Sequence, residues 1–344
     1  MGVQITELLP LKEVSLAELS GKVIAIDTHI YLYQFLATIR QRDGTLLMDS
    51  RGNITSHLSG LFFRTVKLLE NNIRPIFVFD GKPPELKWRE NERRKALKKE
   101  AEALHAEAVA EEDTDAMRKY ASRSVKITKE IISDAKKLIA ILGLPIIEAP
   151  SEGEAQAAHI AKKGDAFAVS SQDADSLLFG TPKLIRNLSI FGKRKRPNKL
   201  AYEEVKPEIV HLDETLNSLG IDHEQLIALS ILVGTDYNPS GIKGIGPKTA
   251  LKLVKAHRRD FDNLFREVKW YEHSDLDWHD IFDIIKNIPV TDDYHLEWKS
   301  IDEDSLKKFL VEEHDFSEER IMNAIKDFTE NKKQKSQSTL SKFF

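Results

Sequence analysis

The chain of 344 residues contains no cysteine. This absence excludes disulfide bonds, zinc-thiolate sites and thiol catalysis. The chain also has no apolar run long enough to span a bilayer, and no stretch with the charged, apolar and small-residue order of a signal peptide. With 41% hydrophobic and 31% charged residues, the composition is that of a globular protein. It predicts a cytoplasmic location and no membrane partner.

The net charge of −4 is unevenly distributed along the chain. Residues 262–330 hold 20 Asp and Glu against 8 Lys and Arg, a local net charge of −12, so the remainder carries +8. That positive excess is concentrated in residues 86–99, 193–199 and 243–259. A single basic run is commonly only a solvated surface, but local stripes of this kind also bind phosphates. Three of them favour a nucleic-acid partner.

Short apolar runs alternate with longer amphipathic stretches in the first half of the chain. We expect strands at 22–26, 74–79 and 165–170, and helices at 31–41, 55–72 and 127–143. Continuous apolar strands between amphipathic helices are typical of a parallel sheet covered on both faces. The fold class is therefore predicted to be α/β, with a mostly parallel central sheet and helices on both faces.

Three other segments differ from this core. Residues 85–125 are rich in Ala, Glu, Lys and Arg with few large apolar side chains, which predicts exposed helices that project from the core. Residues 223–259 are predicted to form a helix-hairpin-helix element. Residues 331–344 are polar and basic before a final pair of phenylalanines, which predicts a flexible tail. The predicted core is 1–330, including the first two segments.

Seven carboxylates follow strand ends or turn residues, where a parallel sheet places its ligand crevice. They are Asp27, Asp80, Glu152, Glu154, Asp173, Asp175 and Asp236. Mg²⁺ prefers oxygen ligands, and two such ions about 4 Å apart can activate a water and stabilise the leaving oxygen in phosphoryl chemistry. Because so many negative charges repel one another at one edge, they require cations. The sequence predicts a two-metal site.

Each acid also has an ordinary structural explanation. Asp27 and Asp80 could cap helices at strand-to-helix turns, and Asp236 in "GTDYNPSG" could form an Asx-turn. Asp173 and Asp175 could belong to turn chemistry in "SSQDAD". Caps and turns do not require seven acids at one sheet edge, so the metal site is favoured.

The stretch "APSEGEAQ" is ambiguous in itself. Ser151 and Glu154 have the spacing of a capping box at the start of a helix, whereas Glu152 has no role in such a cap. We expect Ser151 to cap the helix and Glu152 to face the metals. One carboxylate can hardly both close a capping box and bind a metal ion, so the direction of the Glu154 side chain stays open.

The segment 241–259, "GIKGIGPKTALKLVKAHRR", combines a glycine-rich turn with a basic helix. Gly244 and Gly246 permit a tight turn whose N–H groups can meet a phosphate, and Lys248 and Lys252 share one face of the helix. A plain turn is the alternative for the glycines alone. Together with the basic helix they predict backbone contacts to duplex DNA.

The tail contains a Q-x-x-L-x-x-F-F pattern formed by Gln337, Leu340, Phe343 and Phe344. An extended basic tail that can order a short hydrophobic plug is a device for docking on a partner. A frayed terminus is the alternative. Two terminal phenylalanines favour docking.

Taken together, these motifs resemble the flap endonucleases of the structure-specific five-prime nuclease superfamily, most closely the archaeal members. The segments that carry the resemblance are "MGVQ", "IAIDTHIYLYQFL", "FVFDGKPPELK", "EAPSEGEAQAA", "SSQDADSLLFG", "LVGTDYNPSGIKGIGPKTA" and "QSTLSKFF". The resemblance covers essentially the whole chain. All seven metal-site carboxylates of the family have counterparts here. Eukaryotic relatives continue past the terminal box and this chain stops at Phe344, which favours an archaeal source.

The resemblance also implies roles for other residues. Lys87 and Arg94 would reach the scissile phosphate, Tyr33 would stack a nucleobase, and Gly2 would pack near the metals. Gly2 and Arg40 are further predicted DNA contacts. The cofactors implied are two Mg²⁺ ions, replaceable by Mn²⁺, with K⁺ in the hairpin turn. The Gln337 box implies docking on the ring-shaped sliding clamp of replication (PCNA).

We therefore expect a monomeric, magnesium-dependent nuclease that removes five-prime flaps at the duplex junction in replication and repair, with five-prime exonuclease activity. It would act at the nucleoid in an archaeal cytoplasm, or in the nucleus of a eukaryote. A sibling five-prime exonuclease or a bubble or junction nuclease is the nearest alternative. A non-catalytic, clamp-tethered factor that binds branched DNA would not need all seven acids. A ribonuclease on a similar acidic sheet would explain neither hairpin nor tail.

Overall fold

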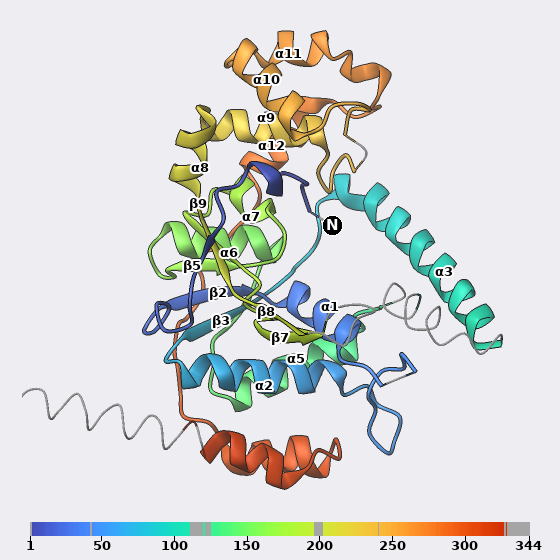
Figure 1. The fold of residues 1–344 in the computed structure, drawn as a ribbon, viewed down its shortest axis with the longest axis vertical. Coiled ribbons are helices and arrows are strands. Elements are labelled where there is room, and N and C mark those ends of the chain that lie inside the picture. Colours follow the sequence, from blue (N-terminus) through green and yellow to red (C-terminus); the bar gives the residue numbers. More distant parts are fainter. Residues whose placement is uncertain are drawn as a thin grey trace, which may run out of the picture.

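The structure is a computed structural model that describes residues 2–41, 43–110, 120, 125–195, 202–239, 241–326 and 328. A central sheet lies between two layers of helices, and helices α9 to α11 form one end of the molecule (Figure 1). Helix α3 projects from the side of this body. No described helix is long and apolar enough to cross a membrane.

The predicted mostly parallel sheet is confirmed. Its strand order is β1-β9-β6-β5-β2-β3-β4. Neighbouring strands from β6 to β4 pair in parallel, whereas β9, near one edge, pairs antiparallel with both β6 and β1. The strands are β1 (Lys12–Glu13), β2 (Val23–Asp27), β3 (Arg74–Phe79), β4 (Ile146–Glu148), β5 (Ala168–Ser170), β6 (Lys183–Arg186) and β9 (Glu208–His211). A separate hairpin pairs β7 (Gly192–Lys195) with β8 (Tyr202–Val205).

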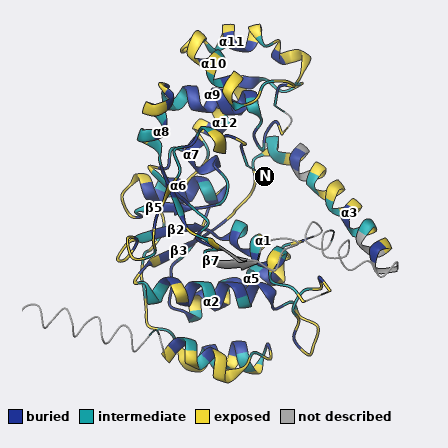
Figure 2. Cartoon of the chain, in the orientation of Figure 1, coloured by how far each residue is buried: buried dark blue, intermediate teal, exposed yellow. Residues whose placement is uncertain are grey.

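Helices cover both faces of the sheet, as predicted. On one face α1 (Thr28–Thr38), α2 (Ser56–Glu70) and α5 (Lys129–Ile141) contribute to one large core, together with α13 (Glu303–Leu306) and the π-helix at Lys307–Glu312. On the other face α6 (Gly153–Lys162) packs against β2, β3 and β5. Figure 2 shows the buried residues concentrated in and between these layers.

A second core extends from the sheet into the helices at the end of the molecule. It is built from α7 (Asp175–Leu178), α8 (Leu212–Leu219), α9 (His223–Val233), α10 (Pro247–His257), α11 (Phe261–Glu267) and α12 (Trp278–Lys286). Short 3₁₀ turns lie at Thr6–Leu8, Glu85–Lys87 and Trp270–Glu272. The first of these packs against α10, so the amino-terminal segment touches the hairpin element.

The strand register places the carboxyl ends of three parallel strands at one edge of the sheet. Ile26 pairs with Phe77 and with Ser170 in parallel ladders, so the carboxyl ends of β2, β3 and β5 lie at one edge, within two residues of the same level. These strands are buried along their lengths, as continuous apolar runs predict. The polar residues that follow them therefore meet at one edge.

Residues 223–239 and 241–259 contain the predicted pair of helices around a tight turn. Helix α9 packs against α10, and Pro247 occupies the first turn of α10. At Gly241, with φ of +52°, an added Cβ would lie 2.2 Å from the carbonyl oxygen of Val233, so only glycine fits there. This close approach holds the turn against the end of α9.

The segment predicted to project is in part a single long helix, α3 (Trp88–Ala110). Many of its described side chains are exposed along its length (Figure 2). Of the predicted segment 85–125, residues 111–119 and 121–124 lie outside the described residues. The same holds for residues 329–344, which include the whole predicted docking box.

The buried His57 predicts a pH-dependent stability. Its ring in α2 has no hydrogen-bond partner in the described structure, and the carboxylate of Asp134 lies 3.9 Å from Nε2. Burial, with a smaller effect from His314, lowers the pKa of His57 to about 3. The unfolded chain takes up this proton below about pH 6.5, whereas the folded protein does not. The contribution of His57 to the free energy of unfolding should therefore fall with decreasing pH, by about 1.4 kcal/mol per unit between about pH 6 and 4.

Urea unfolding of the protein and of His57→Gln at pH 7 and pH 5 checks this expectation. The neutral variant should lose less stability between the two pH values, by roughly 2 kcal/mol, because it has no imidazole to protonate. Equal losses in both proteins would contradict it.

Candidate active site

All seven predicted carboxylates lie at the carboxyl edge of the parallel strands or in the loops that meet it. Asp27 ends β2 and Asp80 follows β3 directly. Glu152 and Glu154 lie at the start of α6, Asp173 and Asp175 at the start of α7, and Asp236 just after α9. The charges of six of these acids act on one another, and Glu152 shares Lys87 with Asp236, so the structure brings the predicted acids together.

Mutual repulsion and burial dominate the electrostatics of this cluster. Burial raises the pKa of Asp27 well above its usual value, and the neighbouring charges of Asp80 and Asp173 raise it further. Burial likewise raises the pKa of Glu154, with Asp27 and Asp175 adding to the effect. For Asp175, burial together with Asp236 and Asp173 raises the pKa to about 7. These carboxylates are therefore costly to ionise without added positive charge.

Part of the missing positive charge comes from two basic side chains at the base of α3. The Lys87 ammonium lies 2.9 Å from Glu152 Oε1 and 3.0 Å from Asp236 Oδ2. Arg94 Nη2 donates to the other oxygen of Asp236 at 2.6 Å. Burial would raise the pKa of Asp236, but Lys87 and Arg94 outweigh it and hold the pKa below its usual value. Both predicted phosphate contacts thus reach the acid cluster.

The two glutamates of "APSEGEAQ" point to different partners. Glu152 precedes α6 and accepts from the Tyr237 hydroxyl at 2.9 Å, in addition to its contact with Lys87. Glu154 accepts from the Ser171 hydroxyl at 2.6 Å and interacts with Asp27, Asp173 and Asp175. Glu154 therefore faces the other carboxylates.

The predicted capping box is wrong. Glu152, and not Ser151, occupies the N-cap position of α6, and its side chain makes no capping hydrogen bond. The Gly153 N–H donates instead to Asp80 Oδ1 at 2.6 Å, so an acid from the end of β3 satisfies the first turn of α6. The Ser151 carbonyl accepts from the Gly81 N–H, which keeps this loop against Asp80.

Two acids combine a structural role with their place in the cluster. Asp27 caps α1 by accepting from the Ile30 N–H at 3.2 Å, as the ordinary explanation allowed. Asp80 does not cap the segment that follows it but caps α6 across the fold. The Asp80 N–H also donates to His29 Nδ1 at 3.2 Å. Capping fixes the direction of these carboxylates and does not remove them from the cluster.

The amino-terminal segment holds the pair Asp173 and Asp175. The Gly2 N–H donates to Asp173 Oδ2 at 3.0 Å, and the Val3 N–H donates to Asp175 Oδ1 at 2.7 Å. A Cβ at Gly2 would lie 2.6 Å from Asp173 Cβ, so glycine allows this approach. The expected position of Gly2 beside the acids is what the structure has, whereas its contact with DNA stays a prediction.

Several partners of the acids were not predicted from the sequence. Tyr237, Ser171, His29 and Val3 all hold a carboxylate or its backbone through the bonds described above. Tyr237 and Ser171 lie within two residues of a predicted ligand, and His29 lies two residues after Asp27, which was the available signal. Val3 acts through its backbone, so no side-chain pattern could have identified it.

The remaining residues that were predicted to contact DNA take no part in the hydrogen bonds to the seven acids described above. Tyr33 is 40% exposed on α1. Arg40 donates to the carbonyl oxygens of Leu36 and Gly44, so part of its guanidinium closes the end of α1. Gly244, Gly246, Lys248 and Lys252 are exposed at the hairpin, and Lys248 lies 3.6 Å from Glu7. Their binding to DNA stays a prediction.

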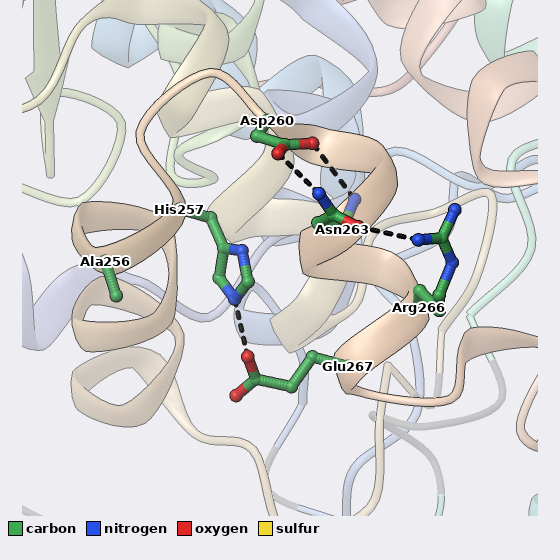
Figure 3. A pocket seen from close by; sticks show the side chains of 6 residues that line it. All are labelled: Ala256, His257, Asp260, Asn263, Arg266 and Glu267. Carbon is green, nitrogen blue, oxygen red and sulfur yellow. Dashed lines mark hydrogen bonds and ion pairs between the residues drawn. The ribbon is translucent and has the colours of Figure 1, made fainter.

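A separate hollow of about 500 Å³ lies between α10 and α11. Figure 3 shows that its polar side chains bond to one another: His257 to Glu267 at 2.6 Å, and Asn263 to Asp260 and Arg266. The bond between His257 and Glu267 joins α10 to α11, whereas the bonds of Asn263 lie within α11 and its N-cap. The hollow contains none of the seven acids, so we assign it no part in the chemistry.

The acid cluster has the donor atoms that a divalent cation requires. Carboxylate oxygens are hard ligands suited to such ions, and the raised pKa values of Asp27, Glu154 and Asp175 show the need for positive charge. Among the described residues, no group of three or more His, Asp or Glu side chains is already arranged so that it could hold a metal ion. The donor set therefore fits metal ions, although these side chains would have to adjust to coordinate them.

Known proteins resemble this chain over most or all of its length. Two family models match the chain: the XPG N-terminal domain over residues 1–101 and the XPG I-region over residues 143–236. The chain is 55% identical to "Flap endonuclease 1" of Pyrococcus abyssi, over all of this chain and 98% of that relative. This chain belongs to the flap endonuclease family. The structure-specific five-prime nuclease resemblance, and with it a hydrolase of phosphodiester bonds, is confirmed.

Solved structures share the fold. The flap endonuclease-1 structure from Methanococcus jannaschii covers 97% of this chain and all of its own, with a TM-score of 0.75 and 40% identity. The catalytic core of Rad2 in complex with DNA substrate superimposes over 95% of this chain with a TM-score of 0.70 at 24% identity, which shows the fold alone. Nucleases of this family use divalent metal ions. The predicted fold class is confirmed.

Repulsion between Asp175 and the neighbouring carboxylates predicts that bound metal ions stabilise the folded protein. Because the pKa of Asp175 is about 7 in the folded protein and near 4 in the unfolded chain, ionisation of Asp175 should make a destabilising contribution to the metal-free protein that grows as the pH rises from about 4 to 7. Asp175→Asn removes this charge. At pH 8 in chelator the variant should melt at least about 2 °C higher than the unmodified protein, and should gain less from added Mg²⁺.

Differential scanning calorimetry at pH 8, with chelator and with Mg²⁺, measures both quantities. Asp293→Asn, which changes an exposed acid outside the cluster, serves as the control and should leave both unchanged. An equal Mg²⁺-induced shift in Asp175→Asn would remove Asp175 from the metal site.

Proposed function

We propose that the chain hydrolyses one phosphodiester at the junction between duplex DNA and a single-stranded five-prime flap, using two Mg²⁺ ions. The observation that carries this proposal is the convergence of seven carboxylates with Lys87 and Arg94 at one edge of the sheet. The residues that would hold the ions are Asp27, Asp80, Glu152, Glu154, Asp173, Asp175 and Asp236. Mn²⁺ has the same preference for oxygen ligands and should substitute.

The chemistry divides between the ions and the side chains. Mg²⁺ ions held by the seven carboxylates would neutralise them, and would supply the activation of a water and the stabilisation of the leaving oxygen. Lys87 and Arg94 lie beside Glu152 and Asp236, from where their charges would stabilise the negative charge that grows on the phosphate oxygens. Tyr33 is exposed on α1, and we assign it the stacking of a nucleobase drawn out of the duplex.

Duplex and single strand would bind to different parts of the molecule. The exposed lysines Lys248 and Lys252 begin the basic helix α10, where phosphates can also meet the backbone N–H groups around Gly244 and Gly246. Gly2 and Arg40 are assigned to the same branched DNA. Helix α3 would border the path of the single strand, as the first part of an arch over residues 85–125. We place K⁺ in the turn between α9 and α10.

The tail is proposed to tether the enzyme to a sliding clamp. The nuclease core would end near residue 330. The docking box beyond it would be formed by Gln337, Leu340, Phe343 and Phe344. The free protein would be a monomer. The relatives reported above come from archaea, so we place the enzyme in the cytoplasm with the nucleoid. Five-prime exonuclease activity would use the same site.

Cleavage of defined substrates tests the enzyme proposal. End-labelled five-prime flap, nicked, bubble and four-way DNA are incubated with Mg²⁺ and with chelator. Flap DNA should be cut best, only with the metal, and Asp175→Asn should bind flap DNA while cutting at least about a hundredfold more slowly. Binding of flap DNA without any cleavage would refute the proposal, and a preference for four-way DNA would favour a junction nuclease.

Deletion of residues 337–344 tests the tether. The truncated protein should keep its basal flap cleavage and lose the stimulation by added clamp, because the deletion removes the docking box alone. Steady-state cleavage with and without the clamp measures both. Stimulation that survives the deletion would refute the proposed tether.

A further inference from the structure

Glu90 is a buried carboxylate on a helix that otherwise carries many exposed side chains. It lies in the first turn of α3 and is only 1% exposed. Burying a carboxylate costs several kcal/mol unless cations and hydrogen bonds compensate it. None of the seven predicted metal ligands is Glu90, and a phosphate-binding surface has no general use for an added negative charge. Its burial therefore needs a specific reason.

The partners of Glu90 are two consecutive arginines. Arg94 Nε donates to Glu90 Oε1 at 2.6 Å, while Arg93 donates from Nε to Oε2 at 2.6 Å and from Nη2 to Oε1 at 2.8 Å. The two guanidinium groups hold the pKa of Glu90 below its usual value despite burial, which would raise it. Glu90 is thus ionised at neutral pH.

The bond to Arg94 fixes one end of a guanidinium whose other end enters the acid cluster. Arg94 donates from Nε to Glu90 and from Nη2 to Asp236 Oδ1, both at 2.6 Å. Arginine has five N–H donors in a rigid plane, so two such bonds set the orientation of that plane. A long side chain on an exposed helix would otherwise sample many rotamers.

We propose that Glu90 is a positioning residue that holds the guanidinium of Arg94 toward the scissile phosphate. This inference rests on the role assigned to Arg94 under the proposed function. Because Glu90 binds Nε, it can keep the plane in place when the Nη groups exchange Asp236 for phosphate oxygens. Among the described residues, the hydrogen bonds of the Glu90 carboxylate go to Arg93 and Arg94 and not to the seven acids.

The test replaces Glu90 by Gln, which keeps the shape and removes the charge. Single-turnover cleavage of five-prime flap DNA in Mg²⁺ should slow by about tenfold or more, which is the usual cost of losing an orienting partner. Binding of the same DNA in chelator and the melting temperature should change little. Glu92→Gln is the matched control, since Glu92 pairs with Lys95 three residues later on the same helix but is 59% exposed. It should cleave at the unmodified rate.

Double mutants separate positioning from a general effect on the helix. If Glu90 acts through Arg94, Glu90→Gln should add no further loss of rate to Arg94→Ala, but should still slow Arg93→Ala. An undiminished loss in the Arg94→Ala background, or an unchanged rate in Glu90→Gln alone, would overturn the inference. If Arg94→Ala itself cleaves normally, the role proposed for Arg94 fails first. That result is distinguishable, because it does not depend on Glu90.

Discussion

Repulsion among carboxylates at the carboxyl edge of the sheet is the constraint on which the active site depends. Parallel pairing of β2, β3 and β5 ends three strands at one edge, where Asp27 is buried and the charges of Asp80, Asp173 and Glu154 act on it or on one another. Without compensating charge such a cluster would oppose folding. Lys87 and Arg94 supply part of that charge from outside the sheet, so the base of α3 is bound to the acids before any substrate arrives.

Capping hydrogen bonds at the starts of two helices orient two of the acids. Asp27 caps α1 and Asp80 satisfies the first turn of α6, so these carboxylates are oriented by backbone N–H groups. A capping bond occupies one oxygen and leaves the other, which is why a cap and a metal ligand are compatible in one residue. Glu154, released from capping by Asp80, is free to turn toward Asp27, Asp173 and Asp175.

The amino-terminal segment links the acids to the hairpin element. Gly2 and Val3 bind Asp173 and Asp175 through their backbone, and the 3₁₀ turn that follows packs against α10. Lys248 on α10 lies near Glu7 in that turn. The surface proposed for duplex DNA and the site proposed for cleavage are therefore joined by a few residues of chain, which fits a nuclease that must cut at a set position relative to a duplex end.

The sequence by itself predicted a mostly parallel sheet with the strands β2, β3 and β5, the seven acids as candidate ligands, and the family, because apolar runs that end in acids are visible in local pattern and motifs. The strands β1, β4, β6 and β9 were not predicted. The sequence also could not determine which group each side chain meets. The capping of α6 by Asp80, the direction of Glu154 and the bonds from Gly2 and Val3 join residues tens to more than a hundred positions apart. Only the packed fold brings such groups within hydrogen-bond distance. The same is true of Arg94, whose partner on α3 is local but whose partner Asp236 is not.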